Sequence, residues 1–457
     1  MELETPGTFR DRPINIDDSG RRNWIYAKQP KGEWYRRRTV VAWLAISFLA
    51  LAPFIKINGN PLMLLDIANR KFSIFGQLIW AQDSYLMALI MAVTVVFIVL
   101  FTVIYGRIWC GWACPQTIFL EMIYRRIEYL FDGNYRGHSK RKEFTSQLFF
   151  IKLAKHAVFI LVSILITNVF LNWIIGPEQL WAIISEPIQN HLFGFFAMIG
   201  LSLFYYWIYA FFREQVCTMI CPYGRLQGVL LDSKSIAVIY DYKRGEPRGP
   251  RNTGDCIDCH QCVSVCPTGI DIKNGSQLEC INCTACIDEC NIVMKKINKP
   301  KNLIRFDSVY GIETGKRSVL NARTYAYSTV LAILIIVLAI TIFNRKPIET
   351  TMLRVSGSIY QQVDSVTYSN LYLLKIINKT QADKTILLKL ISPKSGKIQL
   401  VTGQTLLKTQ GTIESVVIVN LNQNNLTGKS TPIEVGVFEG ETLLQKYSTN
   451  FLGPTTK

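Results

Sequence analysis

Long apolar blocks separated by polar segments fill most of the first three quarters of the chain. Five such blocks lie at 39–57, 85–105, 154–175, 192–212 and 326–343, and each is close to the ~20 apolar residues that a helix needs to cross a bilayer. Arg36, Arg37 and Arg38 precede the first block as in a signal peptide, but we expect an uncleaved helix there. The pattern predicts a polytopic α-helical membrane protein with about five transmembrane helices.

The remaining segments differ from one another in character. Residues 1–38 are polar and show no periodicity, which favours a mostly disordered N-terminal arm. Residues 346–457 alternate apolar and polar positions in short runs such as TILLKLIS and ESVVIVNLN, with turn signals such as PKSG and NQNN between them. This pattern predicts an all-β immunoglobulin-like sandwich, and it would lack the inter-sheet disulfide because no Cys follows Cys290.

Composition agrees with a membrane protein and gives no reason to expect a nucleic-acid partner. The chain is 49% apolar, and its formal net charge of +17 comes from basic residues that flank the apolar blocks. Such residues mark the cytoplasmic side of a membrane protein. The basic ends of the segment 213–325 fit the same explanation, although a docking face for an acidic redox partner is an alternative. These basic residues include Lys243, Arg244, Arg248, Arg251, Lys295, Lys296, Lys316 and Arg317.

The loops predict which side of the membrane each segment occupies. The loop 176–191 has no Lys or Arg, and the loop 58–84 has only Arg70 and Lys71, whereas the loop 115–153 is basic. The basic residues of that loop are Arg125, Arg126, Arg136, Lys140, Arg141, Lys142 and Lys152. The positive-inside rule therefore places the N-terminus and residues 213–325 in the cytoplasm and the C-terminal β domain outside.

Eight of the 12 cysteines form two matching runs, CIDCHQCVSVCP and CINCTACIDECN. Each run has the C-x2-C-x2-C-x3-C spacing that holds [4Fe–4S] clusters in bacterial ferredoxins, where the fourth Cys of a run ligates the other cluster. Zinc sites more often use two separated CxxC pairs. We therefore expect two [4Fe–4S] clusters in a ferredoxin-type domain at 213–325. One cluster is assigned to Cys256, Cys259, Cys262 and Cys290, and the other to Cys280, Cys283, Cys286 and Cys266.

The other four cysteines form two similar C-x3-C-P motifs. Cys110 and Cys114 follow the second apolar block, and Cys217 and Cys221 follow the fourth. On a helix, residues i and i+4 share a face, so each pair could present two sulfurs to one point. Soft thiolates select Cu(I), but a zinc site, a redox disulfide and simple burial of apolar Cys are alternatives. The repeated motif also suggests an internal duplication of the helices.

Other cofactors are not indicated by the sequence. The four histidines are His138, His156, His191 and His260, and none forms the facing pair that a membrane haem requires. His260 lies inside the first Cys run, where we expect it to form hydrogen bonds near a cluster. Met219 could add a thioether ligand, but packing is the simpler explanation. No Rossmann glycine motif leads into a helix, so NAD and FAD are not expected.

Together these features resemble the CcoG/FixG/RdxA family, the accessory proteins of cbb3-type cytochrome c oxidase assembly. The resemblance rests on two C-x3-C-P motifs after membrane helices, a two-cluster insert, a last helix and a C-terminal β domain, and it covers the chain from about residue 39. One departure is Asn291. It follows Cys290, the fourth Cys of the second run, whereas Pro267 follows Cys266, the fourth Cys of the first run. NapH-like quinol-oxidising proteins share the C-x3-C-P motifs, but the β domain distinguishes the CcoG type.

The resemblance implies a cupric reductase of the bacterial inner membrane, with the β domain in the periplasm. Cys110, Cys114, Cys217 and Cys221 would handle copper, and Cu(I) would pass to a copper transporter or chaperone and to oxidase assembly factors. The electron donor and the oligomeric state, including a homo-oligomer, are left open. A quinol-linked membrane electron relay and a non-redox assembly scaffold are the alternative functions.

Overall fold

A computed structural model describes residues 21–454 apart from short gaps. The gaps are 23, 58, 67–70, 81–82, 134–145, 250–252, 276, 317–321, 346, 356, 358, 381, 402–404 and 410. The chain divides into two compact units, Met1–Leu338 and Ala339–Lys457, which are described separately. Several predicted features lie outside the described residues: the arm before residue 21, Arg70, Arg136, His138, Lys140, Arg141, Lys142, Arg251 and Arg317.

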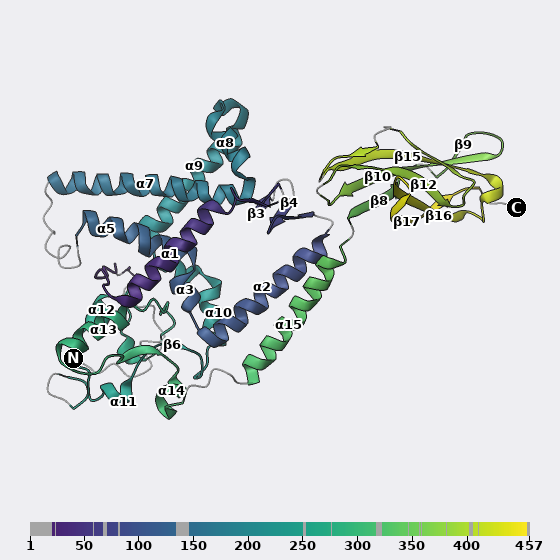
Figure 1. Cartoon of the computed structure of the whole chain (residues 1–457). Coiled ribbons are helices and arrows are strands. Elements are labelled where there is room, and N and C mark those ends of the chain that lie inside the picture. The colour runs from purple at the N-terminus through teal and green to yellow at the C-terminus, as the bar shows by residue number, and fades with distance from the viewer. Residues whose placement is uncertain are drawn as a thin grey trace. The chain divides into compact units, whose positions relative to one another are not determined.

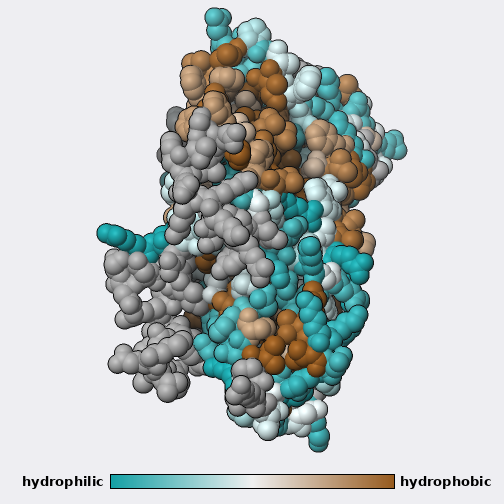
Figure 2. Space-filling view, turned by 90° about the vertical axis from the view of Figure 1, so that its left-hand side faces the viewer, coloured by the Kyte–Doolittle hydropathy of each residue, from teal (hydrophilic) through white to brown (hydrophobic). Residues whose placement is uncertain are grey.

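Four helices among the described residues are long and apolar enough to cross a membrane (Figure 1). The apolar segments are Tyr85–Tyr105, Phe149–Ile175, Ile188–Phe212 and Ala322–Phe343, and each coincides with a predicted span. They belong to α2 (Ser84–Tyr105), α7 (Ser146–Ile175), α9 (Leu192–Trp207) with its flanking turns, and α15 (Ala322–Phe343). On the face drawn in Figure 2, hydrophobic side chains gather in the upper part, and a second, smaller group lies lower on the same face.

The first predicted span differs from the structure in its boundaries. Helix α1 covers Glu33–Leu51 rather than 39–57, and Lys56–Ile57 form the short strand β1. Ala52 keeps helical dihedral angles and its amide donates to the Phe48 carbonyl, but Pro53 has no amide hydrogen to donate, so the helical hydrogen-bond pattern stops there. The first two turns of α1 carry Glu33, Arg36, Arg37 and Arg38, so α1 is not among the four apolar helices of the described chain. A fifth span stays a prediction.

The prediction of a disordered arm is wrong for the described residues 24–38. The Lys28 amide donates to the Ser264 carbonyl over 2.8 Å, and the Tyr129 hydroxyl donates to the Ala27 carbonyl. The amides of Trp34 and Tyr35 donate to the Asp288 carboxylate. Such contacts reach residues more than a hundred positions away, so local periodicity could not indicate them.

Shorter elements connect the long helices. The segment between α1 and α2, predicted as a loop, folds into two small antiparallel sheets, β1 with β2 and β3–β4–β5. The strands are β2 (Asn60–Pro61), β3 (Met63–Asp66), β4 (Lys71–Ile74) and β5 (Gln77–Trp80). The short helices are α3 (Ile108–Trp112), α4 (Pro115–Phe119), η2 (Leu120–Tyr124), α5 (Arg125–Phe131), α8 (Pro177–Ser185), η3 (Ile188–His191), η4 (Ile208–Phe212), η5 (Val216–Ile220) and α10 (Pro222–Leu230).

The cysteine-rich insert is built on a two-stranded sheet in which β6 (Ala237–Tyr240) pairs with β7 (Ile304–Asp307). Buried Val238, Ile272, Ile287 and Leu303 form its core together with several of the Cys side chains. The remaining elements are α11 (Tyr242–Gly245), α12 (Gln261–Ser264), η6 (Ile272–Asn274), α13 (Ala285–Lys296) and α14 (Val309–Thr314).

The second unit contains two packed antiparallel sheets, as the alternating runs predict. One sheet has the order β13–β15–β10–β8 with β9 beside β10, and the other has the order β12–β16–β17. Alternate residues of β15 are buried, and Tyr372, Val417, Val435 and Phe451 belong to the shared core. The strands are β8 (Ile348–Arg354), β9 (Gln361–Gln362), β10 (Thr367–Asn378), β11 (Lys384–Thr385), β12 (Leu387–Ser392), β13 (Lys397–Leu400), β14 (Leu406–Leu407), β15 (Thr412–Asn422), β16 (Ser430–Glu439) and β17 (Thr442–Leu452), with η7 at Gln423–Asn425.

Candidate iron–sulfur and thiolate sites

The two Cys runs adopt the same backbone conformation at equivalent positions. Asp258 and His260 in the first run, and Asn282 and Thr284 in the second, all have φ between 53° and 67°. This left-handed region is uncommon for residues other than glycine, and Asp, Asn and His tolerate it best. Two such residues turn the chain twice within each C-x2-C-x2-C segment, which directs its cysteines toward one cavity.

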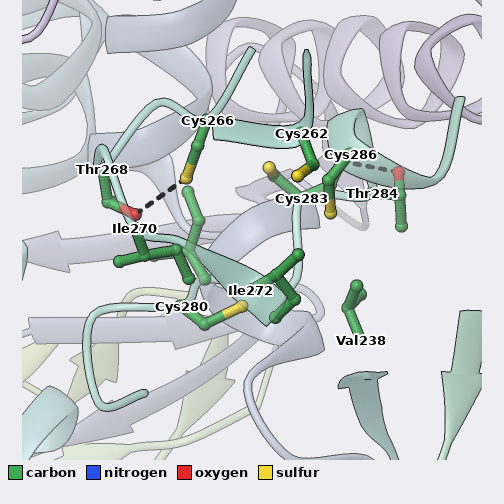
Figure 3. A pocket seen from close by; sticks show the side chains of 11 residues that line it. Val238, Cys262, Cys266, Thr268, Ile270, Ile272, Cys280, Cys283, Thr284 and Cys286 are labelled. Carbon is green, nitrogen blue, oxygen red and sulfur yellow. Dashed lines mark hydrogen bonds between the residues drawn. The ribbon is translucent and has the colours of Figure 1, made fainter. Parts of the chain in front are cut away.

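The second run lines a cavity, which we call the proximal cavity (Figure 3). Four of its cysteines are the set assigned to one cluster: Cys266, Cys280, Cys283 and Cys286. Cys262 and the apolar side chains of Val238, Ile270 and Ile272 also line this cavity. The Cys266 sulfur lies 3.4 Å from the Thr268 hydroxyl. An apolar cavity with thiols on its wall is the surrounding that an iron–sulfur cluster requires.

The first run lines a second cavity, which we call the distal cavity. Its cysteines are Cys256, Cys259, Cys262 and Cys290, the other predicted set. Cys259 is exposed, whereas no cysteine of the proximal set is exposed. His260 also lines this cavity, and its Nδ1 lies 3.2 Å from Lys273 Nζ. The distal cavity is therefore the more accessible of the two.

Within the described residues, no three His, Cys, Asp or Glu side chains converge as they would around a single metal ion. Burial raises the pKa of the Cys262, Cys280 and Cys290 thiols to about 12. Thiols held in such an apolar environment become thiolates when a metal compensates their charge. The cysteines thus fit a cluster with sulfurs spread around a cavity.

The C-x3-C-P motifs have the same architecture as each other, but they are not continuous helices. Cys110 lies in α3 and Cys217 in the π-helical turn η5, whereas Cys114 and Cys221 are extended residues that precede α4 and α10. The expectation that both sulfurs of a motif share the face of one helix is therefore wrong, because the second Cys of each motif is not helical. Pro115 and Pro222 explain the break, because each occupies the first position of a new helix and disfavours helical geometry before it.

The two motifs lie together, and each contributes a polar group to the other. The Gln227 amide, from the helix after Cys221, contacts the Cys110 sulfur, with Nε2 at 3.5 Å and Oε1 at 3.6 Å. Burial raises the pKa of Cys110 to about 11, the Gln227 amide opposes this shift, and the charges of Cys114 and Cys221 add to it. The sulfurs of Cys110, Cys114 and Cys221 are thus close enough to interact electrostatically.

The reciprocal group is Thr117, from the helix after Cys114. Burial raises the pKa of Cys217 to about 12, and the nearby Thr117 hydroxyl lowers it, although this buried hydroxyl makes no hydrogen bond of normal geometry. Backbone amides of Gln116 and Thr117 act in the same direction on Cys114, whose pKa burial raises. Met219, considered above as a further ligand, is 39% exposed.

The first motif packs directly against the second Cys run. A Cβ placed on Gly111 would lie 2.3 Å from the Ile281 carbonyl oxygen and 3.2 Å from Cys283 Cα. The Trp112 indole donates to the Asn282 carbonyl over 3.2 Å, and Cys110 packs on the cluster of buried residues that includes Cys283. Cys110 is therefore the C-x3-C-P cysteine that borders the proximal cavity's wall.

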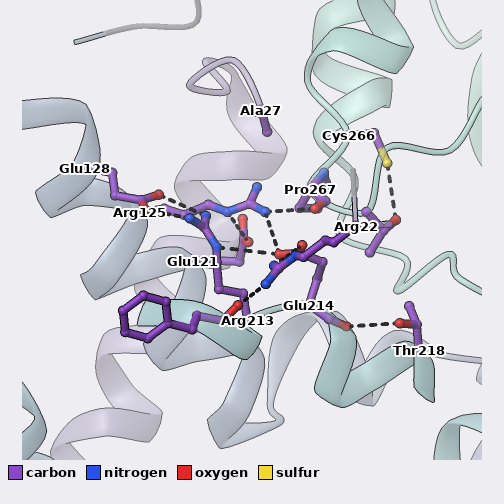
Figure 4. A network of polar contacts seen from close by, with 12 residues as sticks. Arg22, Ala27, Glu121, Arg125, Glu128, Arg213, Glu214, Thr218, Cys266 and Pro267 are labelled. Carbon is purple, nitrogen blue, oxygen red and sulfur yellow. Dashed lines mark hydrogen bonds and ion pairs between the residues drawn. The ribbon is translucent and has the colours of Figure 1, made fainter. Parts of the chain in front are cut away.

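A buried network of charges, which the sequence did not indicate, joins the second motif to the insert (Figure 4). Arg125 pairs with Glu121 at 3.1 Å and with Glu214 at 3.8 Å, and it donates to the Pro267 carbonyl at 2.8 Å. Arg22 pairs with Glu214, and Arg213 pairs with both Glu214 and Glu128. Glu214 is three residues from Cys217, and Pro267 follows Cys266. The network therefore connects the second C-x3-C-P motif to the segment that carries a cysteine of the proximal cavity.

The other histidines do not meet. His156 Nδ1 lies 3.0 Å from the Tyr206 hydroxyl, and its ring stacks on Phe211. His191 pairs with Glu186 at 2.9 Å. His156 thus contacts residues of α9 and η4, and His191 contacts Glu186, so in the described chain both rings have partners other than a histidine.

Comparisons with known proteins agree with this arrangement. A 4Fe-4S dicluster domain matches residues 212–253 and 246–309, and a 4Fe-4S binding domain matches residues 87–136. The latter segment has only two cysteines, Cys110 and Cys114, so it does not by itself supply four thiolates. The immunoglobulin-like fold at the C-terminus of FixG matches residues 338–454.

Three relatives resemble much of the chain. Protein RdxA of Cereibacter sphaeroides is 30% identical over 381 residues, 79% of this chain and 80% of RdxA. Protein RdxB of the same organism is 28% identical over 384 residues, 79% of this chain and 80% of RdxB. Nitrogen fixation protein FixG of Rhizobium meliloti is 31% identical over 306 residues, 63% of this chain but only 57% of FixG.

The fold and the paired thiol cavities define an iron–sulfur electron-transport protein with apolar membrane helices. The chain belongs to the FixG/RdxA family, as the match to RdxA and the C-terminal domain show.

Proposed function

We propose that the two cavities hold two [4Fe–4S] clusters. Cys256, Cys259, Cys262 and Cys290 would hold the one in the distal cavity, and Cys266, Cys280, Cys283 and Cys286 the one in the proximal cavity. When bound, these clusters accept and donate single electrons. The protein supplies the thiols and the apolar walls of the two cavities.

We further propose that the electrons reduce copper at the four remaining cysteines. Cu(II) takes up one electron and becomes Cu(I), without transfer of a proton to the metal. Thiolate sulfur is a soft ligand and prefers Cu(I), so the site favours the product. The reaction would be that of a membrane cupric reductase, with an external one-electron donor as the source of electrons.

One observation carries this proposal: the backbone contact of Gly111 with Ile281 and Cys283. It places the Cys110 thiol beside the wall of the proximal cavity, and the Gln227 contact links Cys110 to the second motif. A purely structural role for the four cysteines would not require them to gather next to a cluster-binding loop.

The cellular setting follows from the charge distribution and the family. We propose a bacterial inner-membrane protein with five spans, α1 included, a cytoplasmic insert and a periplasmic β domain. Cu(I) would leave to a copper transporter or chaperone and serve the assembly of cbb3-type cytochrome c oxidase. The cytoplasmic location suits the eight cluster cysteines, which must be reduced.

Replacing Cys110, Cys114, Cys217 and Cys221 together by Ser tests the copper site. The variant should lose copper binding and cupric reductase activity, while its iron and sulfide contents stay at those of two [4Fe–4S] clusters. Copper binding and reduction that persist would refute the site. A loss of iron from the variant would instead assign these cysteines to a further cluster.

The same variant separates the alternatives. A quinol-linked relay predicts that clusters reduced in advance are reoxidised by a quinone and not by Cu(II). A non-redox scaffold predicts that neither oxidant reacts faster with the wild type than with the Ser variant.

A further inference from the structure

Two buried arginines near the proximal cavity form no ion pair within the part of the chain that the structure describes, although the half-buried Glu279 carboxylate is close enough for the charge of Arg107 to act on it. Arg38 is 2% exposed and Arg107 is 6% exposed. Arg38 Nη2 and Arg107 Nε are also buried without a hydrogen-bond partner. A buried cation is costly unless an anion compensates it, so these two residues require an explanation.

Arg38 reaches the junction between the first C-x3-C-P motif and the second Cys run. It extends from α1, and its Nε donates to the Gly111 carbonyl over 2.7 Å. Gly111 is the residue whose backbone contacts Ile281 and Cys283. Arg38 is thus one backbone contact away from Cys283, a cysteine of the proximal cavity, and it brings a buried positive charge to that side of the cavity.

Arg107 lies on another side of the same junction. It precedes α3, and its guanidinium donates to the Gly224 carbonyl of the second C-x3-C-P helix. Its neighbour Gly106 lies against the second Cys run, since a Cβ placed there would be 3.5 Å from Asn282 Nδ2, and the Cys280 thiol contacts Asn282 Oδ1 at 3.5 Å. Arg107 thus lies between the second Cys run and the second C-x3-C-P helix.

The cations near the distal cavity are compensated. Lys273 contacts the carboxylates of Asp258 and Asp271. Arg244 pairs with Asp255 at 2.7 Å. The two cavities therefore have similar thiol walls but differ in the charge around them.

A cluster held by four thiolates carries net negative charge, and each added electron increases it. Nearby positive charge stabilises the more negative form, and net charge and solvent exposure are among the factors that set cluster potentials. We propose that Arg38 and Arg107 make the proximal cluster the one with the higher reduction potential, so that electrons received at the exposed distal side move toward Cys110. This inference rests on the two-cluster part of the proposed function and does not depend on copper.

The experiment is an anaerobic redox titration of the full-length protein, followed by electron paramagnetic resonance and without copper. In Arg107→Met and Arg38→Met, the higher of the two midpoint potentials should fall by about 59 mV, a tenfold change for a one-electron couple. The lower potential should stay in place. Arg107→Lys keeps the charge and should restore most of the loss.

Two controls locate the effect. Arg323→Met removes an exposed arginine that pairs with Asp232, and it should change neither potential. Lys273→Met should lower only the lower potential, because Lys273 lines the distal cavity. Iron content checks cluster loading. If a Met variant does not load its clusters, the Gln variant at the same position, Arg38→Gln or Arg107→Gln, replaces it.

The proposal is overturned if the arginine variants leave both potentials unchanged, shift both equally, or shift the lower one. Failure of copper reduction with the expected shift in potential would refute the copper proposal and leave this one intact. Normal copper reduction without the shift in potential would refute the present proposal and leave the copper proposal intact.

Discussion

Gly111 and Ile281 are in backbone contact, so close that a Cβ on Gly111 would lie 2.3 Å from the Ile281 carbonyl oxygen. This contact joins a membrane-proximal thiol motif to a cluster-binding loop that follows it by about 170 residues in the chain. Since the obstructing atom belongs to the backbone, it cannot rotate away as a flexible side chain could. A methyl group added at Gly111 would therefore push the first C-x3-C-P motif and the second Cys run apart.

Gly111→Ala should separate the two sites by displacing one backbone from the other, at a stability cost of about 1–3 kcal/mol. Reoxidation of reduced clusters by Cu(II) should slow by about tenfold or more, because small displacements of reacting groups have large effects on rate. Stopped-flow absorbance measures this. Gly200→Ala is the matched control, since nothing lies within 4 Å of its added methyl group. Equal rates in the two variants would contradict the proposed route.

Gln227→Leu should weaken Cu(I) binding while both clusters remain. The side chain is fully buried, and its amide contacts the Cys110 sulfur. Groups that orient a metal's ligands typically contribute about tenfold or more to affinity. Competition with a Cu(I) chelator measures the loss, with Gln362→Leu in exposed β9 as the control. An unchanged affinity would remove Gln227 from the copper site.

Arg125→Met should destabilise the protein strongly, because it leaves Glu121 and Glu214 buried with less positive charge around them. Breaking a buried ion pair in this way costs about 3–5 kcal/mol. The exposed pair of Arg37 with Glu33 provides a control, and its loss should cost only about 0–1 kcal/mol. Thermal unfolding in detergent compares the two variants. Similar melting temperatures would show that the network of Figure 4 contributes little.

The sequence predicted those features that depend on local spacing. Four apolar helices, the sheets of the C-terminal unit and the grouping of the cluster cysteines around two cavities follow from period and motif. The left-handed residues Asp258 and Asn282 were not predicted, although Asp and Asn at matching positions of the two runs are a signal that could have been used.

Long-range contacts explain what the sequence did not predict. In the sequence, Arg38 is one of three arginines that precede an apolar block and would mark the cytoplasmic side of a membrane helix. In the structure it is buried, and it donates to the carbonyl of Gly111, 73 residues away. Trp34 and Tyr35 lie in a polar arm, yet their amides bind Asp288. Neither periodicity nor composition carries information about such partners. The helical geometry expected for the C-x3-C-P motifs was wrong because the proline following each second Cys starts a new helix.

The most direct test of the account is reoxidation of the clusters by copper. The purified protein is reduced anaerobically, the reductant is removed, and Cu(II) is added while cluster absorbance and chelator-trapped Cu(I) are followed together. The account predicts that Cu(I) appears in proportion to cluster reoxidation, and much faster than in the variant with Ser at Cys110, Cys114, Cys217 and Cys221. Clusters that stay reduced with Cu(II) but are reoxidised by a quinone would contradict it.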